Sequence, residues 1–440
     1  MNPDPELLSA IKSRLRCTPQ KQRVRGCCIF KTPSCLQEIE DFYTIPQVVS
    51  LGLYHVDPFQ FINEAKIVYL KKFLLRSRHN IDHFIVTLNG LFNRIVHCYQ
   101  QSESSSSKVK DKEEEQRKKR GEITKLTPPE VSIIMLSDGA FLIEFLRRHI
   151  MFQDLPLLQD PQDPIFSKGW LVHGVFLDML KMENQIPFFV LRSLAEEWFG
   201  EEELFRMLFR LLKYYNGLNS EYNTQFWGGV HILEFFSNIM FSFSSDHNRS
   251  HDNGNHHSFT YTMPSVTQLL KSGIKLNTIA SSSPILNINY NKNKRVLCIP
   301  KITLNQATCI LITNTVAYEL CRDDHIRYCA DYVFFMHRLL KEPTDVELLL
   351  EAGVLTFGSV EDWRVTRFLC EVAEKVVYDR HSYLGNQVTE IQISYASRRA
   401  RINRKYFSKP WSWFSAISAV VVLVTSIIQT VFTFLMYFRK

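Results

Sequence analysis

The feature that most limits how this chain can fold is a long uncharged segment near its C-terminus. From Trp411 to Phe438 the sequence runs for 28 residues without a charged side chain, and it includes the apolar run Ala419–Val424. About 20 apolar residues in a helix are enough to cross the hydrocarbon core of a bilayer. A buried core helix seldom needs this length. We therefore predict a single transmembrane helix over residues 410–438, which has the lipid bilayer as its partner through residues 411–438.

Both ends of this segment have the side chains that are typical of membrane–water interfaces. Trp411 and Trp413 stand at one end and Tyr437 at the other, as in the aromatic belts of membrane proteins. Residues 398–409 form a basic juxtamembrane segment with six positive and no negative side chains, and residues 1–20 contain no apolar run of signal-peptide length. By the positive-inside rule and the lack of a signal peptide, we expect the body to lie in the cytosol. We expect a single-pass membrane protein and name the plasma membrane as its membrane.

The positive charge of the chain is concentrated in this tail. The formal net charge is +7, whereas the basic juxtamembrane segment together with Arg439 and Lys440 contributes eight positive charges. The rest of the chain is therefore close to neutral. A nucleic-acid-binding domain usually shows a basic patch or stripe, so we expect no nucleic acid among the partners.

Ahead of the tail, the hydrophobic pattern predicts a mainly α-helical globular body. We expect residues 1–26 to be a poorly ordered N-terminus and residues 27–397 to form the body. Two polar segments, near 101–128 and 242–260, interrupt it and have the composition of flexible loops. The fold class is therefore mainly α, with a small β-hairpin and a C-terminal single transmembrane helix.

The spacing of apolar residues predicts the individual elements. The expected helices cover 63–76, 79–100, 129–148, 172–199 with a break at Pro187, 204–215, 229–241, 265–272, 304–320, 329–340, 344–351 and 363–378. Leu286–Tyr290 alternates apolar and polar residues, and Arg295–Ile299 returns after a turn-like segment. This pattern predicts a β-hairpin, the one place where we expect strands.

The sequence contains none of the motifs that mark common catalytic or cofactor sites. The phosphate-binding loop, the dinucleotide fingerprint, the nucleophile elbow and the HExxH zinc helix are absent, and the ten cysteines form no CxxC pair. We therefore expect no catalytic residue, no cofactor and no metal site. Most of the cysteines are expected to be reduced residues of the core.

Four carboxylates lie beside long apolar runs, and two interpretations of them are open. They are Asp138, Glu144, Asp178 and Glu183. Two carboxylates that converge in a cleft could act as an acid–base pair in an uncharacterised enzyme. Alternatively, they cap helices or pair with nearby arginines such as Arg147, Arg148 and Arg192. We favour the structural interpretation and keep the enzyme as the alternative.

Three blocks of sequence carry a resemblance to a known family. They are Ile45–His55, Leu136–Glu144 and Glu183–Phe189 (ENQIPFF). They are similar to blocks of the plant-specific family called domain of unknown function 247, and the last matches its most diagnostic string. Further blocks fit in the same order, at 264–275, 314–319, 344–346 and 410–430. The resemblance extends over nearly the whole chain.

The resemblance implies a membrane-anchored protein with no established enzymatic activity. Members at grass self-incompatibility loci are candidate pollen-side recognition determinants, so we expect recognition or signalling through an unknown protein partner. The matched motif residues are Pro46, Gly52, Tyr54, His55, Asp138, Gly139, Glu183, Asn184, Gln185, Pro187 and Phe188. We interpret them as structural, because prolines and glycines set turns and helix ends and the two amides can join helices. A soluble regulator whose apolar tail packs on its own body is a further alternative.

Self-association of the predicted transmembrane helix is a separate hypothesis. Thr425, Gln429 and Thr433 recur every four residues and therefore lie on one stripe of the helix. The amide of Gln429 could bond to the same stripe of a second copy, which would make a homo-oligomer. In the competing interpretation, both threonine hydroxyls bond back to carbonyls of their own helix, and we favour this one slightly.

The anchor can be tested by placing charge in its centre. Replacing Val422 and Leu423 by Arg should abolish membrane retention, because each central Arg costs about 2.5–3.5 kcal/mol on insertion scales. The measurement is fractionation of membranes from soluble protein. Unchanged fractionation would mean that another surface or a partner holds the protein at the membrane.

Overall fold

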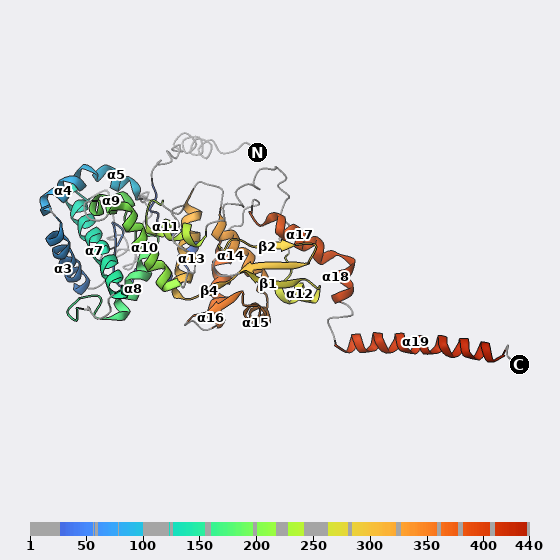
Figure 1. The fold of residues 1–440 in the computed structure, drawn as a ribbon. Helices are drawn as coiled ribbons and strands as arrows, with labels where there is room; N and C mark the ends of the chain where they lie inside the picture. Colours follow the sequence, from blue (N-terminus) through green and yellow to red (C-terminus); the bar gives the residue numbers. More distant parts are fainter. Residues whose placement is uncertain are drawn as a thin grey trace, which may run out of the picture.

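A computed structural model describes most of the chain and is mainly helical, as predicted, with two small sheets (Figure 1). The described residues are 27–55, 57, 60–77, 79–99, 123, 126–154, 160–196, 200–216, 228–241, 263–279, 284–322, 327–358, 362–376, 382–404 and 410–437. The expectations for residues 1–26, for nearly all of 101–128 and for 242–260 lie outside these residues.

Most of the helices follow the predicted pattern, but those at 41–44, 385–396 and 398–402 were not predicted. The helices are the 3₁₀-helix η1 (Ser34–Leu36) and α2 (Asp41–Thr44), α3 (Gln60–Arg76), α4 (Ile81–Gly90), α5 (Phe92–Cys98), α7 (Pro128–Asp154), α8 (Gly169–Met179), α9 (Phe188–Ala195), α10 (Gly200–Asn216), α11 (Ile232–Met240), α12 (Val266–Lys271), α13 (Gln306–Cys321), α14 (Tyr328–Leu339), α15 (Pro343–Glu351), α16 (Asp362–Lys375), α17 (Gly385–Ala396), α18 (Arg398–Ile402) and α19 (Pro410–Tyr437). The predicted break at Pro187 is present, but it is wider than predicted, because α8 ends at Met179 and α9 begins at Phe188.

The long helix α7 organises the N-terminal half of the body. At its start, the backbone N–H and the hydroxyl of Thr127 both donate to the Glu130 carboxylate, at 2.8 Å each. Its middle is buried on nearly all sides, since it packs against α3, α4, α9 and α10 (Figure 1). Gly139 permits the contact with α9, because a Cβ there would lie 2.4 Å from Cδ1 of Leu194.

The C-terminal half combines helices with the two sheets. In the first sheet β3 (Val296–Pro300) lies between β2 (Asn289–Asn291), which is antiparallel to it, and β1 (Lys275–Ile279), which is parallel. In the second sheet β4 (Ile302–Leu304) pairs in parallel with β5 (Leu355–Phe357). The helix α13 connects the two halves, because it packs against α2, α8, α10, α11 and α14. A continuous hydrophobic core therefore runs through the body.

Further expectations about the elements also need correction. The predicted helix at 79–100 is two helices, because the chain leaves the regular helix at Leu91 between α4 and α5. The predicted hairpin is present as β2 and β3, but its first strand begins only at Asn289. The strands β1, β4 and β5 were not predicted from the sequence. Their parallel partners are distant in sequence, so no hairpin pattern indicates them.

The C-terminal helix α19 is long and apolar enough to cross a membrane. The candidate span covers the 21 residues Ile417–Tyr437, and its most apolar part is not buried inside the protein. In Figure 1 it lies apart from the helical body. The structure therefore differs from the alternative in which the tail packs on its own body.

Candidate functional site

The family-like motifs meet around one irregular segment of backbone, residues 45–55. This segment follows α2 and has neither helical nor strand structure, yet most of it is buried. Buried backbone N–H groups that have no place in a helix or sheet need other hydrogen-bond partners. Side chains from α7, α8 and the loop after α8 supply them. We call these side chains, with the segment, the motif cluster.

Asp178, near the end of α8, binds the start of the segment. Its carboxylate accepts hydrogen bonds from the backbone N–H groups of Gln47, Val48 and Val49 at 2.9, 2.6 and 2.9 Å. Lys181 neutralises it, with Nζ 2.9 Å from Asp178 Oδ1, and both side chains are about 1% exposed. Burial lowers the pKa of Lys181, and the contact with Asp178 opposes this. Asp178 is therefore a structural anchor for the segment.

Asn184 continues the same pattern one step further along the segment. Its Oδ1 accepts from the N–H of Leu51 at 2.6 Å, and its Nδ2 donates to the carbonyls of Val49 and Asp178 at 3.0 Å each. The side chain is fully buried. The one amide group of Asn184 thus pairs with an N–H and a carbonyl of the segment and with a carbonyl of α8.

Asp138 on α7 binds the next turn of the segment and a buried lysine. Its Oδ2 accepts from the N–H of Gly52 at 2.9 Å, and its Oδ1 lies 2.7 Å from Nζ of Lys66 on α3. Lys66 also bonds Asp57 at 2.7 Å and the carbonyl of Ser50 at 2.6 Å. Burial alone would lower the pKa of Lys66, but Asp138 and Asp57 reverse this and hold it above its ordinary value. The contacts join α3, α7 and the segment.

Gln185 joins the end of α8 to the start of α11, as its amide was expected to do. Its Nε2 donates to the carbonyls of Met179 and Lys181 at 2.9 and 2.7 Å, and its Oε1 accepts from the N–H of Leu233 at 3.0 Å. Its own carbonyl accepts from the hydroxyl of Tyr99 at 2.8 Å. All four contacts are buried.

Gly52 lets the segment pass close to this contact. Its φ is +80°, and a Cβ there would lie 2.4 Å from the carbonyl oxygen of Gln185 and 2.5 Å from the hydroxyl of Tyr99. Both the backbone conformation and the space therefore require glycine.

Glu183 connects the segment to the N-terminal part of the body. Its Oε1 accepts from the N–H of Thr32 at 2.8 Å, and its Oε2 lies 3.2 Å from Nε2 of His55. Burial raises the pKa of Glu183, but His55 and Thr32 outweigh this effect and hold it below its ordinary value. The neighbouring Tyr54 donates its hydroxyl to the carbonyl of Ile29 at 3.0 Å.

The remaining motif residues position chain turns and the core. Pro46 is buried at the start of the segment, and Pro187 precedes the first residue of α9. The N–H of Phe188 donates to the carbonyl of Val230 at 2.8 Å, and the ring of Phe188 packs against Phe205 and Phe235.

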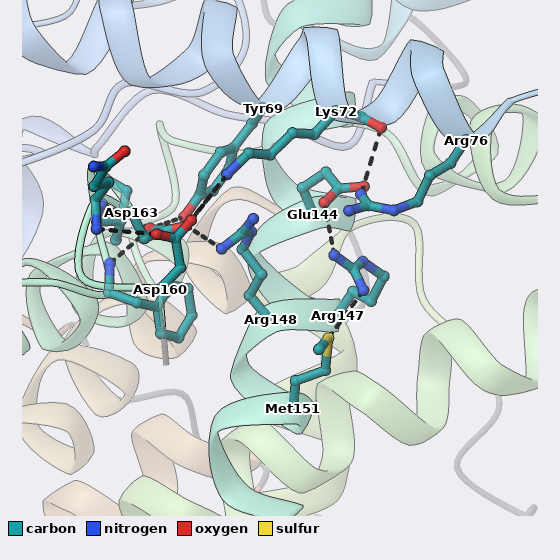
Figure 2. Close-up of polar contacts among 12 residues, drawn as sticks. Tyr69, Lys72, Arg76, Glu144, Arg147, Arg148, Met151, Asp160 and Asp163 are labelled. Carbon is teal, nitrogen blue, oxygen red and sulfur yellow. Dashed lines mark hydrogen bonds and ion pairs between the residues drawn. The ribbon is translucent and has the colours of Figure 1, made fainter. Parts of the chain in front are cut away.

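Glu144 belongs to a separate group of charges between α3 and α7. Figure 2 shows its carboxylate between Arg76 of α3 and Arg147 of α7, and the distance to Arg147 is 3.3 Å. The expected pairing with Arg147 is therefore present. Arg148 and Arg192 pair elsewhere, with Asp163 and with Glu201.

The proposed catalytic carboxylates are thus not a convergent pair. Asp138 binds Lys66 and Gly52, Glu144 binds two arginines, and Glu183 binds Thr32 and His55. These contacts are of the structural kind that we favoured. Among the described residues, no group of three or more His, Cys, Asp or Glu side chains could hold a metal ion.

Several important polar residues were not found from the sequence. Lys66 reads as one of several lysines on the polar face of an amphipathic helix, and its burial is visible only in the structure. The buried amide of Asn314 accepts from the N–H of Met182 at 2.9 Å and donates to the carbonyl of Tyr43 at 2.8 Å. Two signals were available, because Asn314 begins the family-like block 314–319 and is a polar residue inside the apolar helix α13.

His231 was also missed, and it is buried at the start of α11. Its Nδ1 accepts from the N–H of Glu234 at 3.1 Å, and its Nε2 lies 3.0 Å from the carbonyl oxygen of Cys28. A backbone N–H can only donate and a carbonyl can only accept, so both contacts need a neutral ring with its proton on Nε2. Burial lowers the pKa of His231 to about 4.

A cavity of about 540 Å³ opens beside the motif cluster. Its lining includes the motif residue Phe188 together with Phe189, Arg94, Arg192, Cys28 and Cys98. A volume of this size is in the range of small-molecule sites. None of Asp138, Glu144 and Glu183 is among the residues that line it.

In the stripe formed by Thr425, Gln429 and Thr433, both threonines bond to carbonyls of their own helix, as in the interpretation that we favoured. The hydroxyl of Thr425 donates to the carbonyls of Val421 and Val422 at 2.9 Å each, and that of Thr433 donates to the carbonyl of Gln429 at 2.8 Å. Tyr437 is exposed at the end of α19. The side chains of Trp411 and Trp413 lie outside the described residues.

Comparison with known proteins matches most of the chain to one family. The model of the family DUF247, described as a plant protein of unknown function, matches residues 29–425. The chain belongs to this family. It is 27% identical over 447 residues to UPF0481 protein At3g47200 of Arabidopsis thaliana, covering 94% of this chain and 87% of that protein.

A second relative, from the same plant, is similar over a shorter stretch. The putative UPF0481 protein At3g02645 of Arabidopsis thaliana is 24% identical over 172 residues, which is 38% of this chain and 32% of that protein. No solved structure matches the chain. The predicted family membership is therefore confirmed.

Substituting Gly52 tests whether the motif cluster depends on close passage of the backbone. Gly52→Ala should lower the free energy of unfolding by roughly 3 kcal/mol or more, because it adds a strained backbone and an overlap with fixed backbone atoms. The matched control is Gly90→Ala, where a Cβ would meet nothing within 4 Å. Urea unfolding of the two variants should separate them clearly, and equal stabilities would contradict the assigned role of Gly52.

The burial of His231 predicts a pH dependence of stability. Its folded pKa of about 4 lies below the ordinary value of 6.5, so the unfolded chain takes up the proton first. The stabilisation is complete above pH 6.5 and is lost as the pH falls towards 4, by about 3 kcal/mol from the size of the shift.

The matching experiment compares urea unfolding between pH 7 and 4.5 in two histidine variants. His231→Asn should flatten the fall in stability, because asparagine can cap α11 but does not titrate. His83→Asn, at an exposed position of α4, should leave the fall unchanged. Identical pH profiles for wild type and His231→Asn would show that His231 is not the titrating group.

Proposed function

We propose that α19 holds this protein at a membrane and that the helical body binds protein partners in recognition or signalling. The observation that carries the proposal is the span Ile417–Tyr437, which is long, apolar and not buried in protein. Exposed apolar surface of this extent calls for lipid or a partner to cover it. We favour lipid over a protein partner, because a helix of 21 residues is about as long as the hydrocarbon core of a bilayer is thick.

The charges beside the span support a body on the cytosolic side. Arg398, Arg399 and Arg401 are exposed on α18, the last described helix before α19. Basic residues next to a membrane helix are attracted to the anionic cytosolic leaflet, by about 1 kcal/mol each, and they favour the cytosolic side in the positive-inside rule. The plasma membrane is the membrane that we propose.

The contacts of the motif residues support a role other than catalysis. The motif residues Asp138, Asn184 and Gln185 use their polar atoms to bind backbone groups of the body, and so does the nearby Asp178. A protein whose motif residues hold a rigid body together is suited to presenting a surface to partners. We therefore propose that it is not an enzyme. The narrower proposal is a pollen-side role in self-incompatibility, which the family resemblance suggests and which requires expression in pollen.

The topology can be tested with a sequon that the chain already contains. Asn248-Arg249-Ser250 fits the glycosylation signal but is not reached by glycosylation enzymes if the body is cytosolic. In plant microsomes, the body should be digested by added protease without detergent, and glycosidase should not change the mass of the protein. A glycan on Asn248, or protection of the body from protease, would contradict the proposed orientation.

Partner binding can be tested by proximity labelling with the full chain and its unanchored variant. A biotin ligase is fused to the N-terminus of wild type and of the variant with Val422→Arg and Leu423→Arg, and both are expressed in the native tissue. Anchored wild type should label a distinct set of membrane-associated proteins, and a second, differently tagged copy in that set would identify a homo-oligomer. The same labelled set for both proteins would contradict a function that depends on the membrane.

A further inference from the structure

Two cysteines that are far apart in sequence lie side by side at the wall of the cavity. Ile29 forms an isolated parallel bridge with Tyr99, which places Cys28 next to Cys98. The N–H groups of Cys28 and Ile29 both donate to the carbonyl of Cys98, at 2.9 and 2.8 Å. Paired parallel chains lie about 4.8 Å apart, within the Cα separations of about 4.4–6.8 Å that a disulfide spans.

Each of the two thiols shifts the pKa of the other, and the two shifts have opposite directions. A hydrogen bond from the Cys28 thiol lowers the pKa of Cys98; burial opposes this, and the nearby charge of Arg94 adds to it. The same hydrogen bond and burial raise the pKa of Cys28. The thiolate is the nucleophilic form of cysteine, so Cys98 is suited to attack and Cys28 to remain a thiol beside it.

The cavity gives a small molecule access to this pair. Cys28 and Cys98 both line it, and Arg94, His97 and Arg192 supply positive or polar groups on its wall. Arg94 is held in place by stacking on Phe189, with its guanidinium carbon 3.9 Å from the ring centre. The buried cysteines of the helical core differ in this respect. Cys309 does not line the cavity, and burial raises its pKa to about 12.

We propose that Cys28 and Cys98 form a reversible disulfide in response to hydrogen peroxide that enters this cavity. The Cys98 thiolate attacks one peroxide oxygen, the O–O bond breaks, and the hydroxide released takes a proton to become water. Cys98 is then a sulfenic acid. The sulfur of Cys28 attacks the sulfur of Cys98, the S–O bond breaks, and the hydroxide leaves as water with the proton of the Cys28 thiol.

The reaction balances as a two-electron exchange. Two thiols are oxidised to one disulfide, and one hydrogen peroxide is reduced to two waters. A low-molecular-weight thiol such as glutathione reverses it by thiol–disulfide exchange. Transient disulfides of this kind act as redox sensors in reducing compartments. The inference does not depend on the proposed membrane anchor or partners.

The bond would connect parts of the body that carry other contacts. The carbonyl of Cys28 lies 3.0 Å from Nε2 of His231, the residue that caps α11, and Cys98 is the last residue of α5. Oxidation would covalently join the N-terminal segment to α5 at the wall of the cavity. The redox state of the pair would therefore change both the cavity and the attachment of this segment.

The test is peptide mapping of the full chain in detergent micelles. The protein is reduced, freed of reductant, treated with hydrogen peroxide at neutral pH, alkylated and digested. A peptide pair linked through Cys28 and Cys98 should appear, with two thiols lost per peroxide, and glutathione should reverse it. Both cysteines still fully reduced when the exposed Cys35 is oxidised would overturn the proposal, and so would a bond from Cys98 to Cys27.

Single substitutions separate the two roles. Cys28→Ser should leave a sulfenic acid on Cys98 that dimedone traps, whereas Cys98→Ser should abolish both the bond and dimedone labelling of Cys28. Cys35→Ser is the matched control and should behave as wild type. Dimedone labelling of Cys28 in the Cys98→Ser variant would overturn the assignment of the attacking thiol.

The cavity arginine provides a readout that does not remove either cysteine. Arg94→Gln should slow oxidation at neutral pH and move the midpoint of the pH–rate profile upwards, whereas Arg94→Lys should restore the wild-type midpoint. These two Arg94 variants also test the proposal if a variant of a buried cysteine does not fold. An unchanged midpoint in Arg94→Gln would contradict the role of the cavity charge.

Discussion

The body of this protein depends on satisfying the backbone of one buried irregular segment. Residues 45–55 pass between helices without joining a sheet, so each buried N–H needs a partner from elsewhere. Asp178 accepts three such donors, Asn184 accepts one and Asp138 accepts one. Leaving a buried donor unpaired costs about 1–3 kcal/mol. These side chains therefore set the position of the segment, and through it the packing of α3, α7 and α8.

This requirement explains why charged residues lie deep in a mainly apolar body. A carboxylate accepts several hydrogen bonds at once, which makes Asp178 more effective than a neutral side chain at a cluster of N–H groups. The buried charge then needs compensation, which Lys181 and Lys66 supply to Asp178 and Asp138. Acids inside apolar helices that resemble a catalytic set in the sequence are here parts of the scaffold.

The cavity beside the motif cluster is the place where the scaffold brings reactive side chains together. Phe188 of the ENQIPFF motif lines it together with Cys28 and Cys98, whereas the polar residues of this motif bind other groups of the body. Functional groups of this cavity come from the N-terminal segment, α5 and α9, which are separated by long stretches of sequence. A scaffold that holds these elements together thus also brings two thiols and an arginine to one wall.

The sequence by itself determined the elements whose signal is local. The periodicity of apolar residues gave most helices, Pro187 marked the break before α9, and the uncharged run gave α19 to within a residue or two. The motif strings identified the family and most members of the motif cluster, because they are continuous blocks such as Glu183–Phe189. Only the tertiary structure decided what depends on contacts between distant residues.

Three kinds of contact illustrate that limit. The strand β1 pairs with β3 in parallel across an intervening loop and strand, and no local pattern reports such a partner. Lys66 contacts the motif cluster because α3 packs against α7, while its own neighbours in sequence suggest a solvated face. Cys28 and Cys98 become a pair only when the N-terminal segment lies along the end of α5. Burial and hydrogen-bond partners are properties of packing between distant segments, so residue type and spacing could not supply them.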